Sequence, residues 1–408
     1  MDRFDVIVVG AGPAGGQCAR ELAAAGKNVL LAERHRDFTV NNYSSGGAPL
    51  EVMDRFQLPE SIVGSSWNRF VMHSSNDCNE WSSPERRGIV ADFGKLRAFL
   101  ARETANSGGK VQLGFTYQKH EMDDKGVAVW FKDQQSNERR RYHTRVLVDA
   151  TGSERQILGL PDQKNSFPST GIEYLVNVQP DIYKRYAHTL SLFMGHQWVS
   201  QGYAWIFPME PNLLKVGMGR YFQNDRFVPH EKSYRYYLNR MLEKCLGGTD
   251  VSILDKHGKT LIYTYRQQDP HHDRCIIAIG DSVSTLNPLA LEGIRHAMMS
   301  GRIASKHILD YLEGTVSNFD RYVQDMRRYF GWKWRLCEWL MKIIYREPKD
   351  EKVDAMLRTF KHFSFDDMMH LGFDYHWRQA CKFLFHYNRL SLSEFLKTRV
   401  VRKTSRRP

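Results

Sequence analysis

Asp5-Val-Ile-Val-Val-Gly-Ala-Gly-Pro-Ala-Gly15 is the stretch that decides the fold of this 408-residue chain. Its apolar, β-branched first half is typical of a buried parallel strand. The glycine-rich second half opens a strongly helix-forming segment, 17–25, which ends at Gly26. A second apolar strand, 28–32, follows and stops at Glu33. This order of strand, glycine turn, helix, strand and acid predicts a dinucleotide-binding βαβ unit.

Each residue type in the motif has a physical reason. Gly10 permits the tight turn, Gly12 lets the backbone approach a pyrophosphate, and Gly15 lets helix and strand pack closely. The helix N-terminus offers unpaired N–H groups to the phosphates, and Glu33 is placed to accept ribose hydroxyls. The alternative is a purely structural turn. The cofactor contacts expected here are Gly10, Gly12, Pro13, Ala14, Gly15, Glu33 and Arg34.

The composition suits a soluble globular protein with one large or two medium domains, since 42% of the residues are hydrophobic and 25% are charged. Six scattered cysteines argue against a disulfide framework or a zinc site and favour a reducing compartment. We expect no metal. The chain enters its first strand directly and has no apolar stretch of about 18 residues, so we expect neither a signal peptide nor a membrane span. A cytoplasmic location follows.

Positive charge is concentrated at the C-terminal end. Residues 321–408 hold 20 Lys and Arg against 10 Asp and Glu, which is +10 of the net +12. The same segment is rich in aromatic residues: Trp332, Trp334, Trp339, Phe363, Phe365, Phe373, Trp377, Phe383 and Phe385. This mixture favours peripheral contact with an anionic membrane surface. The alternatives are a solvated basic face over a helical core and, less simply, nucleic acid binding, which we do not expect.

A second glycine–acid motif, Gly280-Asp281, follows the buried strand 275–279, and we expect a long helix from Asp281 to about Leu312. Such a motif some 270 residues after the first is typical of a discontinuous FAD domain. Asp281 then lies by the ribityl chain or the nearby phosphate, and the loop 287–293 leads a helix N-terminus toward the isoalloxazine ring. An N-cap without a ligand is the alternative. The expected contacts are Gly280, Asp281, Pro288, Glu292, Gly293 and Ile294.

The remaining pattern completes an α/β architecture. A Rossmann-type FAD-binding domain is expected over 1–65, 90–165 and 270–312, with an antiparallel β-sheet substrate domain inserted over 66–89 and 166–269. Helix is expected over Phe93–Ser107, and strands with a turn at Asp123–Gly126 over Lys110–Phe131. From Gly171 to Phe222 the chain is expected to be mostly strand. Residues 313–408 form a helical, basic, aromatic-rich region whose tail, Arg399–Arg407, is expected to be disordered.

Several groups of residues together resemble the geranylgeranyl reductase family, in particular its chlorophyll-type members. Besides the two flavin motifs, Gly46-Gly47-Ala-Pro49-Leu50 and the helix after it are similar to the family's Cys-Gly-Gly loop. Tyr203-Ala-Trp205-Ile-Phe207-Pro208, followed by Val216-Gly217, resembles its Tyr-x-Trp-x-Phe-Pro signature. Ile344-Tyr345-Arg346 and Phe363-Ser-Phe365-Asp366 are similar to the chlorophyll-type C-terminus.

The resemblance implies a p-hydroxybenzoate hydroxylase-like fold and an FAD-dependent reduction of prenyl double bonds. Electrons come from NADPH or a ferredoxin-like donor, and no second Gly-x-Gly-x-x-Gly is present for a separate NADPH domain. Alternation puts Tyr203, Trp205 and Phe207 on one strand face, a flat apolar wall for a linear isoprenoid or else an ordinary sheet core. With Ser45, Gly46 and Gly47, these aromatic residues are the expected reacting site.

The chain departs from the family in three places. Ser45 replaces the family's cysteine, which leaves any thiol role in proton delivery in doubt. Phe93 replaces an arginine at the start of its helix, for which Lys95 or Arg97 compensates only in part. Ser282-Val-Ser284 replaces smaller residues, a milder change.

Other functions stay open on these residues. A flavin monooxygenase or halogenase-like enzyme shares the fold, although no lysine lies in an evident halogenase motif. A flavin-bearing assembly factor or a carotenoid cyclase is a third, non-redox possibility. For a reductase, the proton donor is Tyr203, a water near Ser45, or His296, of which the last is more readily a helix-face residue.

Overall fold

A computed structural model describes residues 2–40, 44–160, 165–221, 232–248, 251–345 and 349–388. The chain forms two compact units, one from 1–64, 89–169 and 260–338 and the other from 65–88, 170–259 and 339–408. The assignment of these segments to an FAD domain and a substrate domain stays a prediction. Residues 313–408, expected as a region of their own, are divided between the two units. Phe222, Arg346 and the tail Arg399–Arg407 lie outside the described residues.

The first unit is built on a sheet with a parallel centre. Its main path is β17 (His272–Asp273), β18 (Ile276–Ala278), β11 (Arg139–Asp149), β1 (Arg3–Val9), β2 (Val29–Glu33) and β8 (Lys110–Leu113). All neighbours from β18 to β8 are parallel. The central residues of β18, β11, β1 and β2 are fully buried, as the continuous apolar runs predict, whereas those of the edge strand β8 are partly buried. β9 (Phe115–Asp123) and β10 (Gly126–Asp133) extend β11 as an antiparallel hairpin.

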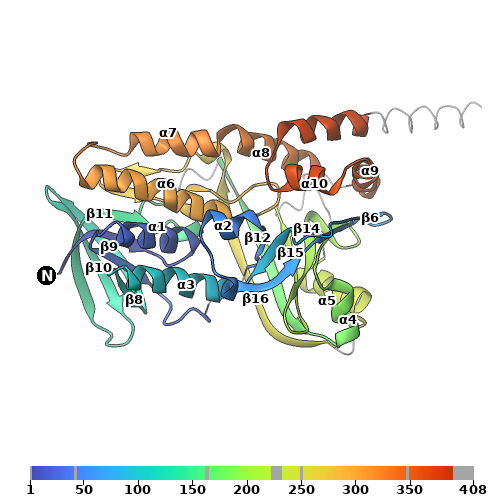
Figure 1. The fold of residues 1–408 in the computed structure, drawn as a ribbon, viewed down its shortest axis with the longest axis horizontal. Helices are drawn as coiled ribbons and strands as arrows, with labels where there is room; N and C mark the ends of the chain where they lie inside the picture. Colours follow the sequence, from blue (N-terminus) through green and yellow to red (C-terminus); the bar gives the residue numbers. More distant parts are fainter. Residues whose placement is uncertain are drawn as a thin grey trace, which may run out of the picture. The chain divides into compact units, whose positions relative to one another are not determined.

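Helices cover this sheet. α1 (Pro13–Ala24) lies between α3 (Phe93–Asn106) and α6 (Ile294–Leu312), and α7 (Asp320–Tyr329) packs beside α6 (Figure 1). α3 begins at Asp92, whose side chain accepts the Lys95 N–H at 3.0 Å. The close approach of α6 to α1 depends on Gly301, because a Cβ there would lie 2.4 Å from the Ala14 carbonyl oxygen.

The second unit is built on a seven-stranded sheet. Its order is β16 (Ser252–Thr264), β12 (Ser166–Asn177), β15 (Leu213–Arg220), β14 (Val199–Met209), β13 (Thr189–Gly195), β5 (Arg69–His73) and β6 (Cys78–Ser82). Residues 166–169 of β12 and 260–264 of β16 belong to the first unit. One face packs against α4 (Pro180–Tyr186) and α5 (Tyr234–Leu246) in a single apolar cluster (Figure 1). Ala204 and Ile206 belong to that cluster, so the alternate residues of β14 face the other side.

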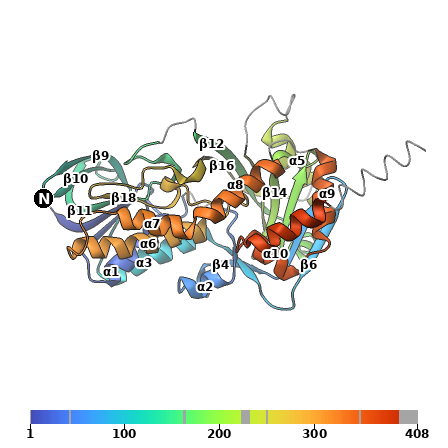
Figure 2. The same ribbon diagram turned by 90° about the horizontal axis from the view of Figure 1, so that it is seen from above.

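The C-terminal helices of the second unit pack beside β6. α9 (Asp350–Phe360) and α10 (Phe365–Gly372) follow α8 (Gly331–Tyr345), and a further helix runs over 377–388 (Figure 2). The Trp81 indole donates to the Phe363 carbonyl oxygen at 2.9 Å, and the Asn79 side chain donates to the Leu357 carbonyl oxygen. Ser364 and Asp367 form a capping box at the start of α10.

The sequence predicted the α/β fold class correctly, and most of its elements are confirmed. Helix α3 and the hairpin turn between β9 and β10 lie where expected. The expectation of a helix from Asp281 was wrong: a short 3-10 turn, η5 (Gly280–Val283), and a loop precede α6, which begins at Ile294. The segment after Gly171 also contains α4, and in its sheet β13 pairs with β5 in parallel.

None of the helices in the described part of the chain is both long enough and apolar enough to span a bilayer.

Candidate functional site

The first glycine motif forms a turn that only glycine allows. Gly10 has a φ of +106°, and a Cβ on it would lie 2.3 Å from the Ala150 carbonyl oxygen. A Cβ on Gly15 would lie 1.9 Å from the Gly10 carbonyl oxygen. Gly12 differs, because a Cβ there would meet nothing within 4 Å. It is the N-cap of α1 and provides no side-chain cap, so no side chain occupies the start of the helix beside Pro13 and Ala14.

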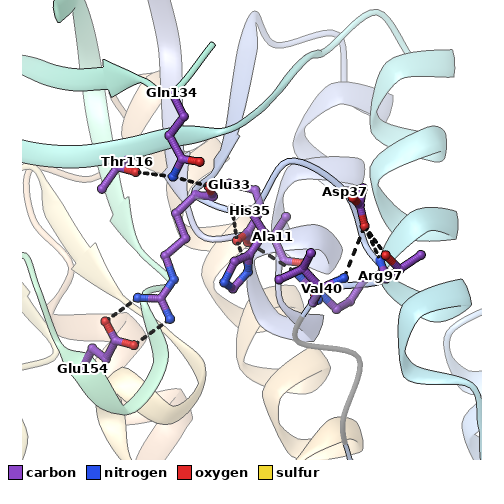
Figure 3. A network of polar contacts seen from close by, with 11 residues as sticks. Ala11, Glu33, His35, Asp37, Val40, Arg97, Thr116, Gln134 and Glu154 are labelled. Atoms are coloured by element: carbon purple, nitrogen blue, oxygen red, sulfur yellow. Dashed lines mark hydrogen bonds and ion pairs between the residues drawn. The ribbon is translucent and has the colours of Figure 1, made fainter. Parts of the chain in front are cut away.

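Glu33 is held in place before any ligand binds. Its carboxylate accepts the Ala11 N–H at 2.9 Å and the His35 N–H at 3.0 Å, and it is 6% exposed (Figure 3). The backbone of the glycine turn thus fixes the acid at the end of β2. This position suits the expected contact with ribose hydroxyls.

Arg97 completes the support of this acid from α3. Its guanidinium lies 3.6 Å from Glu33 Oε2 and donates to the carbonyl oxygens of Ala11 at 3.3 Å and Val40 at 3.1 Å (Figure 3). It is 2% exposed, and the rings of Phe38 and Phe93 lie 5.0 and 5.6 Å from its guanidinium carbon. The arginine missing at position 93 is therefore matched by a buried arginine one helical turn later. From the sequence, Arg97 was expected to compensate only in part for the arginine missing at position 93.

Arg34 has a protein partner. Its guanidinium makes two hydrogen bonds of 2.7 Å to the Glu154 carboxylate, and its side chain is 43% exposed. The expected cofactor contact of Arg34 stays a prediction.

The second glycine motif lies against the first. Gly280 has a φ of +65°, and a Cβ on it would lie 2.8 Å from the Ala14 side chain. The Ser282 hydroxyl donates to Asp149 at 3.2 Å, which ties η5 to the end of β11 beside Asp281. The Thr285 hydroxyl is buried and has no hydrogen-bond partner among the described residues. The fold therefore brings together two motifs some 270 residues apart.

The loop before α6 is braced by a buried charge cluster. The Glu292 carboxylate accepts two hydrogen bonds of 2.8 Å from Arg295, whose third nitrogen reaches Glu51, also at 2.8 Å. Burial alone would raise the pKa of Glu292, but Arg295 and His296 outweigh it and hold that pKa well below its usual range. Glu292 thus faces protein cations, and its predicted cofactor contact stays a prediction.

Two neighbouring residues of the loop mark the start of α6, and their predicted cofactor contacts stay predictions. Gly293 is the N-cap of α6 without a side-chain cap, and Ile294 is the first residue of that helix. Asn287, next to Pro288, accepts the N–H groups of Leu289 and Ala290 at 2.8 and 2.9 Å.

His296, named as a proton donor, lies inside the first unit. It is 1% exposed, lies 3.3 Å from Glu292, and meets the Trp334 ring edge-on with centroids 4.6 Å apart. Burial lowers its pKa, which favours the neutral imidazole. Its surroundings are those of a packed helix residue.

Ser45 and Gly46 precede the short strand β3 (Gly47–Pro49). Gly46 has a φ of +74°, and its carbonyl oxygen accepts the Ala91 N–H at 2.9 Å. That bond joins the loop to β7 (Gly88–Ala91), the middle strand of a small sheet with β3 and β4 (Val63–Trp67). The three predicted positions are adjacent and partly or fully buried.

The aromatic signature of β14 forms part of a cluster in the second unit. Tyr203 lies 5.7 Å from Trp205 and 6.4 Å from both Tyr221 and Tyr345, measured between ring centroids. Tyr221 and Tyr345 stack at 4.5 Å. We call Tyr203, Trp205, Tyr221 and Tyr345 the aromatic cluster. Phe207 is on the same strand face and is 6% exposed.

Burial raises the pKa of Tyr203, and Tyr345 reinforces this, so the phenol stays protonated at neutral pH. It can donate a hydrogen bond but is a weak acid. Tyr345 belongs to the C-terminal segment that resembles the chlorophyll-type proteins, and packing alone brings it to this strand.

Sequence reasoning missed two polar residues at the aromatic cluster. The Trp205 indole donates to the Glu173 carboxylate at 2.8 Å, and the His257 ring lies 3.4 Å from the other oxygen of that carboxylate. In the sequence, Glu173 is visible only as an acid within a strand of apolar and aromatic residues. That pattern does not identify Trp205 or His257 as its partner.

Among the described residues, one group has the donor types of a metal site. The ligand atoms of His370, Asp374 and His376 lie within 4.8 Å of one another in the second unit. His370 and Asp374 are hydrogen-bonded at 2.7 Å, and all three residues are partly or fully exposed. A histidine–aspartate pair at a helix end explains this group.

The first unit fits FAD. Gly12 has open space at the N-terminus of α1, where a pyrophosphate is expected, the Glu33 carboxylate is fixed where a ribose is expected, and Gly280 places the second motif beside α1. The buried Thr285 hydroxyl adds a polar atom near that motif.

The comparisons with known proteins agree. The FAD binding domain family model matches residues 3–333. Digeranylgeranylglycerophospholipid reductase of Haloferax volcanii is 29% identical over 74% of this chain and 75% of its own length. Chloroplastic geranylgeranyl diphosphate reductase of Oryza sativa subsp. japonica is 24% identical over 84% of this chain and 76% of its own.

A solved structure shares the fold. It is a geranylgeranyl bacteriochlorophyll reductase-like protein from Thermoplasma acidophilum, with a TM-score of 0.78 and 20% identity, covering 89% of this chain and 93% of that one. These matches confirm the resemblance read from the motifs. The chain belongs to the FAD binding domain family and is an FAD-dependent oxidoreductase of the geranylgeranyl reductase type.

Proposed function

We propose that this protein reduces carbon–carbon double bonds of a prenyl, geranylgeranyl-type substrate. The observation that carries the proposal is the similarity to named geranylgeranyl-type reductases over about three quarters or more of the chain. The aromatic cluster supports it, since Tyr203, the least buried of its four residues, offers an aromatic ring against which a hydrocarbon chain can pack.

In this proposal the two units have separate tasks. In the first, the α1 N-terminus holds the pyrophosphate, Glu33 holds the ribose, and the Gly280-Asp281 turn and the 287–293 loop hold the remainder of FAD. When bound and reduced, FAD supplies a hydride to one alkene carbon. The second unit binds the prenyl chain against Tyr203, Trp205 and Phe207. Ser45, Gly46 and Gly47 form the loop proposed to face the reaction.

The proton that completes each reduction has two candidate sources, Tyr203 and a water held near Ser45. Burial raises the pKa of Tyr203, so its phenol stays protonated and can donate a hydrogen bond to a water in the site. The electron donor is proposed to be NADPH or a reduced ferredoxin.

The deciding experiment supplies reduced protein with a geranylgeranyl lipid in the absence of oxygen and weighs the products. A gain of about two mass units per saturated bond supports the reductase. In a parallel aerobic assay with NADPH, oxygen consumption coupled to substrate, with an oxygenated or halogenated product, overturns it in favour of the monooxygenase or halogenase-like alternative. A preparation that stays colourless after reconstitution with FAD, or an FAD-bound one that isomerises the lipid without reducing it, favours the non-redox alternative.

We also propose peripheral contact with an anionic membrane surface through the second unit's C-terminal part. Trp339, Ile343, Trp377 and Phe385 there are 45, 49, 57 and 64% exposed. The basic residues Lys342 and Arg378 are exposed beside them in the sequence. Exposed aromatic side chains next to cations suit an interface with acidic lipids.

A further inference from the structure

Four neighbouring strands of the second unit contribute one row of residues. Gly217 on β15 is paired with Glu173 on β12 on one side and with Trp205 on β14 on the other. His257 on β16, the strand beyond β12, contacts Glu173. The row therefore runs His257, Glu173, Gly217, Trp205 across the sheet.

Gly217 has no side chain, and the Trp205 indole occupies the space that a side chain there would fill. A Cβ on it would lie 2.3–2.7 Å from three ring atoms of Trp205, among them the indole nitrogen. The indole therefore lies over Gly217. Only because Gly217 lacks a side chain can Trp205 reach across β15 to hydrogen-bond with Glu173, two strands away.

Glu173 is placed to fix the orientation of that indole. The residue is 4% exposed, and a buried carboxylate is costly unless its oxygens have partners. One oxygen accepts the indole N–H at 2.8 Å, and the other faces His257 at 3.4 Å. The indole has a single N–H donor, so rotating its ring would leave both the donor and the carboxylate oxygen unsatisfied. A hydrogen bond to a charged acceptor is among the stronger kinds.

Packing against Tyr203 makes this orientation matter for the aromatic cluster. The Tyr203 and Trp205 rings are 5.7 Å apart and tilted by 52°, and Tyr203 lies next to Tyr221 and Tyr345. A turned indole would change the surface that Tyr203 packs against.

We propose that Glu173, acting through the gap at Gly217, is a positioning residue that holds Trp205 in the orientation needed to bind the prenyl substrate. This rests on the proposed function, because the substrate is the one assigned there. Glu173 touches Trp205, not the substrate.

The first test measures the indole directly and needs no activity. In protein labelled with ¹⁵N-tryptophan, the indole N–H signal of Trp205 is assigned as the one lost in Trp205→Phe. We expect Glu173→Leu to move that signal upfield and to speed its hydrogen exchange at least about tenfold, as expected for loss of a bond to a charged acceptor. Glu173→Gln keeps an acceptor oxygen and should shift the signal less. An unmoved signal in Glu173→Leu overturns the proposal.

The second test measures turnover. We expect Glu173→Leu to lower kcat/KM for the prenyl lipid roughly tenfold or more, mainly through KM, and Glu173→Gln to restore it to within about threefold of the original. Gly217→Ala should act like Glu173→Leu, because its methyl group displaces the indole. Gly171→Ala, on β12 like Glu173, is the matched control: its Cβ would meet only the Met218 carbonyl oxygen at 3.7 Å.

A double-mutant cycle separates positioning from general damage to the sheet. If Glu173 acts through Trp205, Glu173→Leu should lower kcat/KM no further in a Trp205→Phe background. Additive losses overturn the proposal, as do equal losses in Glu173→Gln and Glu173→Leu with unchanged FAD binding. If the unaltered protein reduces no prenyl lipid, the proposed function fails, while the NMR test still decides whether Glu173 orients the indole.

Discussion

Gly12 in the first unit and Gly217 in the second show two opposite uses of a missing side chain. A Cβ on Gly12 would meet nothing within 4 Å, whereas a Cβ on Gly217 would meet the Trp205 ring at 2.3 Å. We propose that the first space is kept for the cofactor, whereas the second is filled by the Trp205 side chain. We call the first unit the cofactor unit and the second the sheet unit. In this proposal the cofactor unit binds FAD through backbone N–H groups, and in the sheet unit side chains hold one another in place.

The contrast is tested most directly by a side chain that fills the open space at Gly12. We expect Gly12→Val to lower FAD affinity roughly a hundredfold, since a clash of about 3 kcal/mol corresponds to about two factors of ten. The fold should stay intact, because φ at Gly12 is −73° and the added group meets no protein atom. Flavin absorbance after reconstitution measures the first effect and circular dichroism the second.

Gly15→Ala is the counterpart, with a Cβ 1.9 Å from the Gly10 carbonyl oxygen. It should prevent folding of the first unit. Equal behaviour of the two variants would contradict the idea that Gly12 is kept free for a ligand.

Arg97 tests whether the cofactor unit also needs a buried side chain. Arg97→Met removes the cation 3.6 Å from Glu33 and leaves a buried carboxylate with less compensation. Breaking such a pair costs about 3–5 kcal/mol, so we expect a loss of that order in the free energy of unfolding, together with weaker FAD binding.

Urea unfolding and flavin titration measure these effects. Lys95→Ala is the control, because its side chain is 63% exposed and lies 3.6 Å from Asp92. It should change stability by less than about 0.5 kcal/mol. If Arg97→Met left the free energy of unfolding and FAD binding unchanged, backbone N–H groups alone would hold Glu33.

The charge cluster at the start of α6 predicts a pH dependence. Burial lowers the pKa of His296 from 6.5. As pH falls below 6.5, this histidine therefore takes up a proton in the unfolded chain before it does so in the folded protein, and the free energy of unfolding decreases. The lowered pKa of Glu292 acts in the same direction below 4.5, since its stabilising contribution is present above that pH and is lost on acidification.

Stability should therefore fall on going from pH 6.5 toward 5, by at most about 1.4 kcal/mol per unit for one proton. His296→Gln should flatten this slope. Urea unfolding at several pH values checks it, and an unchanged slope in the variant would place the cause elsewhere.

The smallest effect is expected at the surface of the second unit. Trp377→Ala combined with Phe385→Ala should weaken binding to phosphatidylglycerol vesicles by roughly tenfold, since each removes exposed apolar area that a bilayer would cover. Flotation or tryptophan-quenching assays measure it, and raised salt should weaken binding further. Leu254→Ala, a 54% exposed apolar residue on β16, is the control. Equal binding of the double variant and this control would argue for a merely solvated face.

The cofactor unit was largely predictable because its signals are local. Strand, turn and helix follow one another within 33 residues, and the glycines at 10, 12 and 15 each have a distinct steric reason. The Gly280 motif was predicted as well, but its helix was placed too early. The η5 turn and the loop that Asn287 closes with its own side chain come before α6, and no periodicity marks such a loop.

The sheet unit was predictable only along single strands. Alternation correctly put Tyr203, Trp205 and Phe207 on one face. Glu173, His257 and Tyr345 meet them through pairing of β12, β15 and β16 and through packing of α8, and strand order is not written in any short stretch. Arg97 was undervalued for the same reason: its worth comes from Ala11, Glu33 and Val40, all distant in sequence.

The stacking of Trp205 over Gly217 restricts how this protein can evolve. Any side chain at position 217 requires a smaller residue at position 205. A smaller residue there leaves the buried Glu173 carboxylate without its indole donor. Three sites separated by 32 and 12 positions along the chain should therefore change together or not at all. A change at one of them alone is expected to leave the indole donor or the carboxylate without its partner.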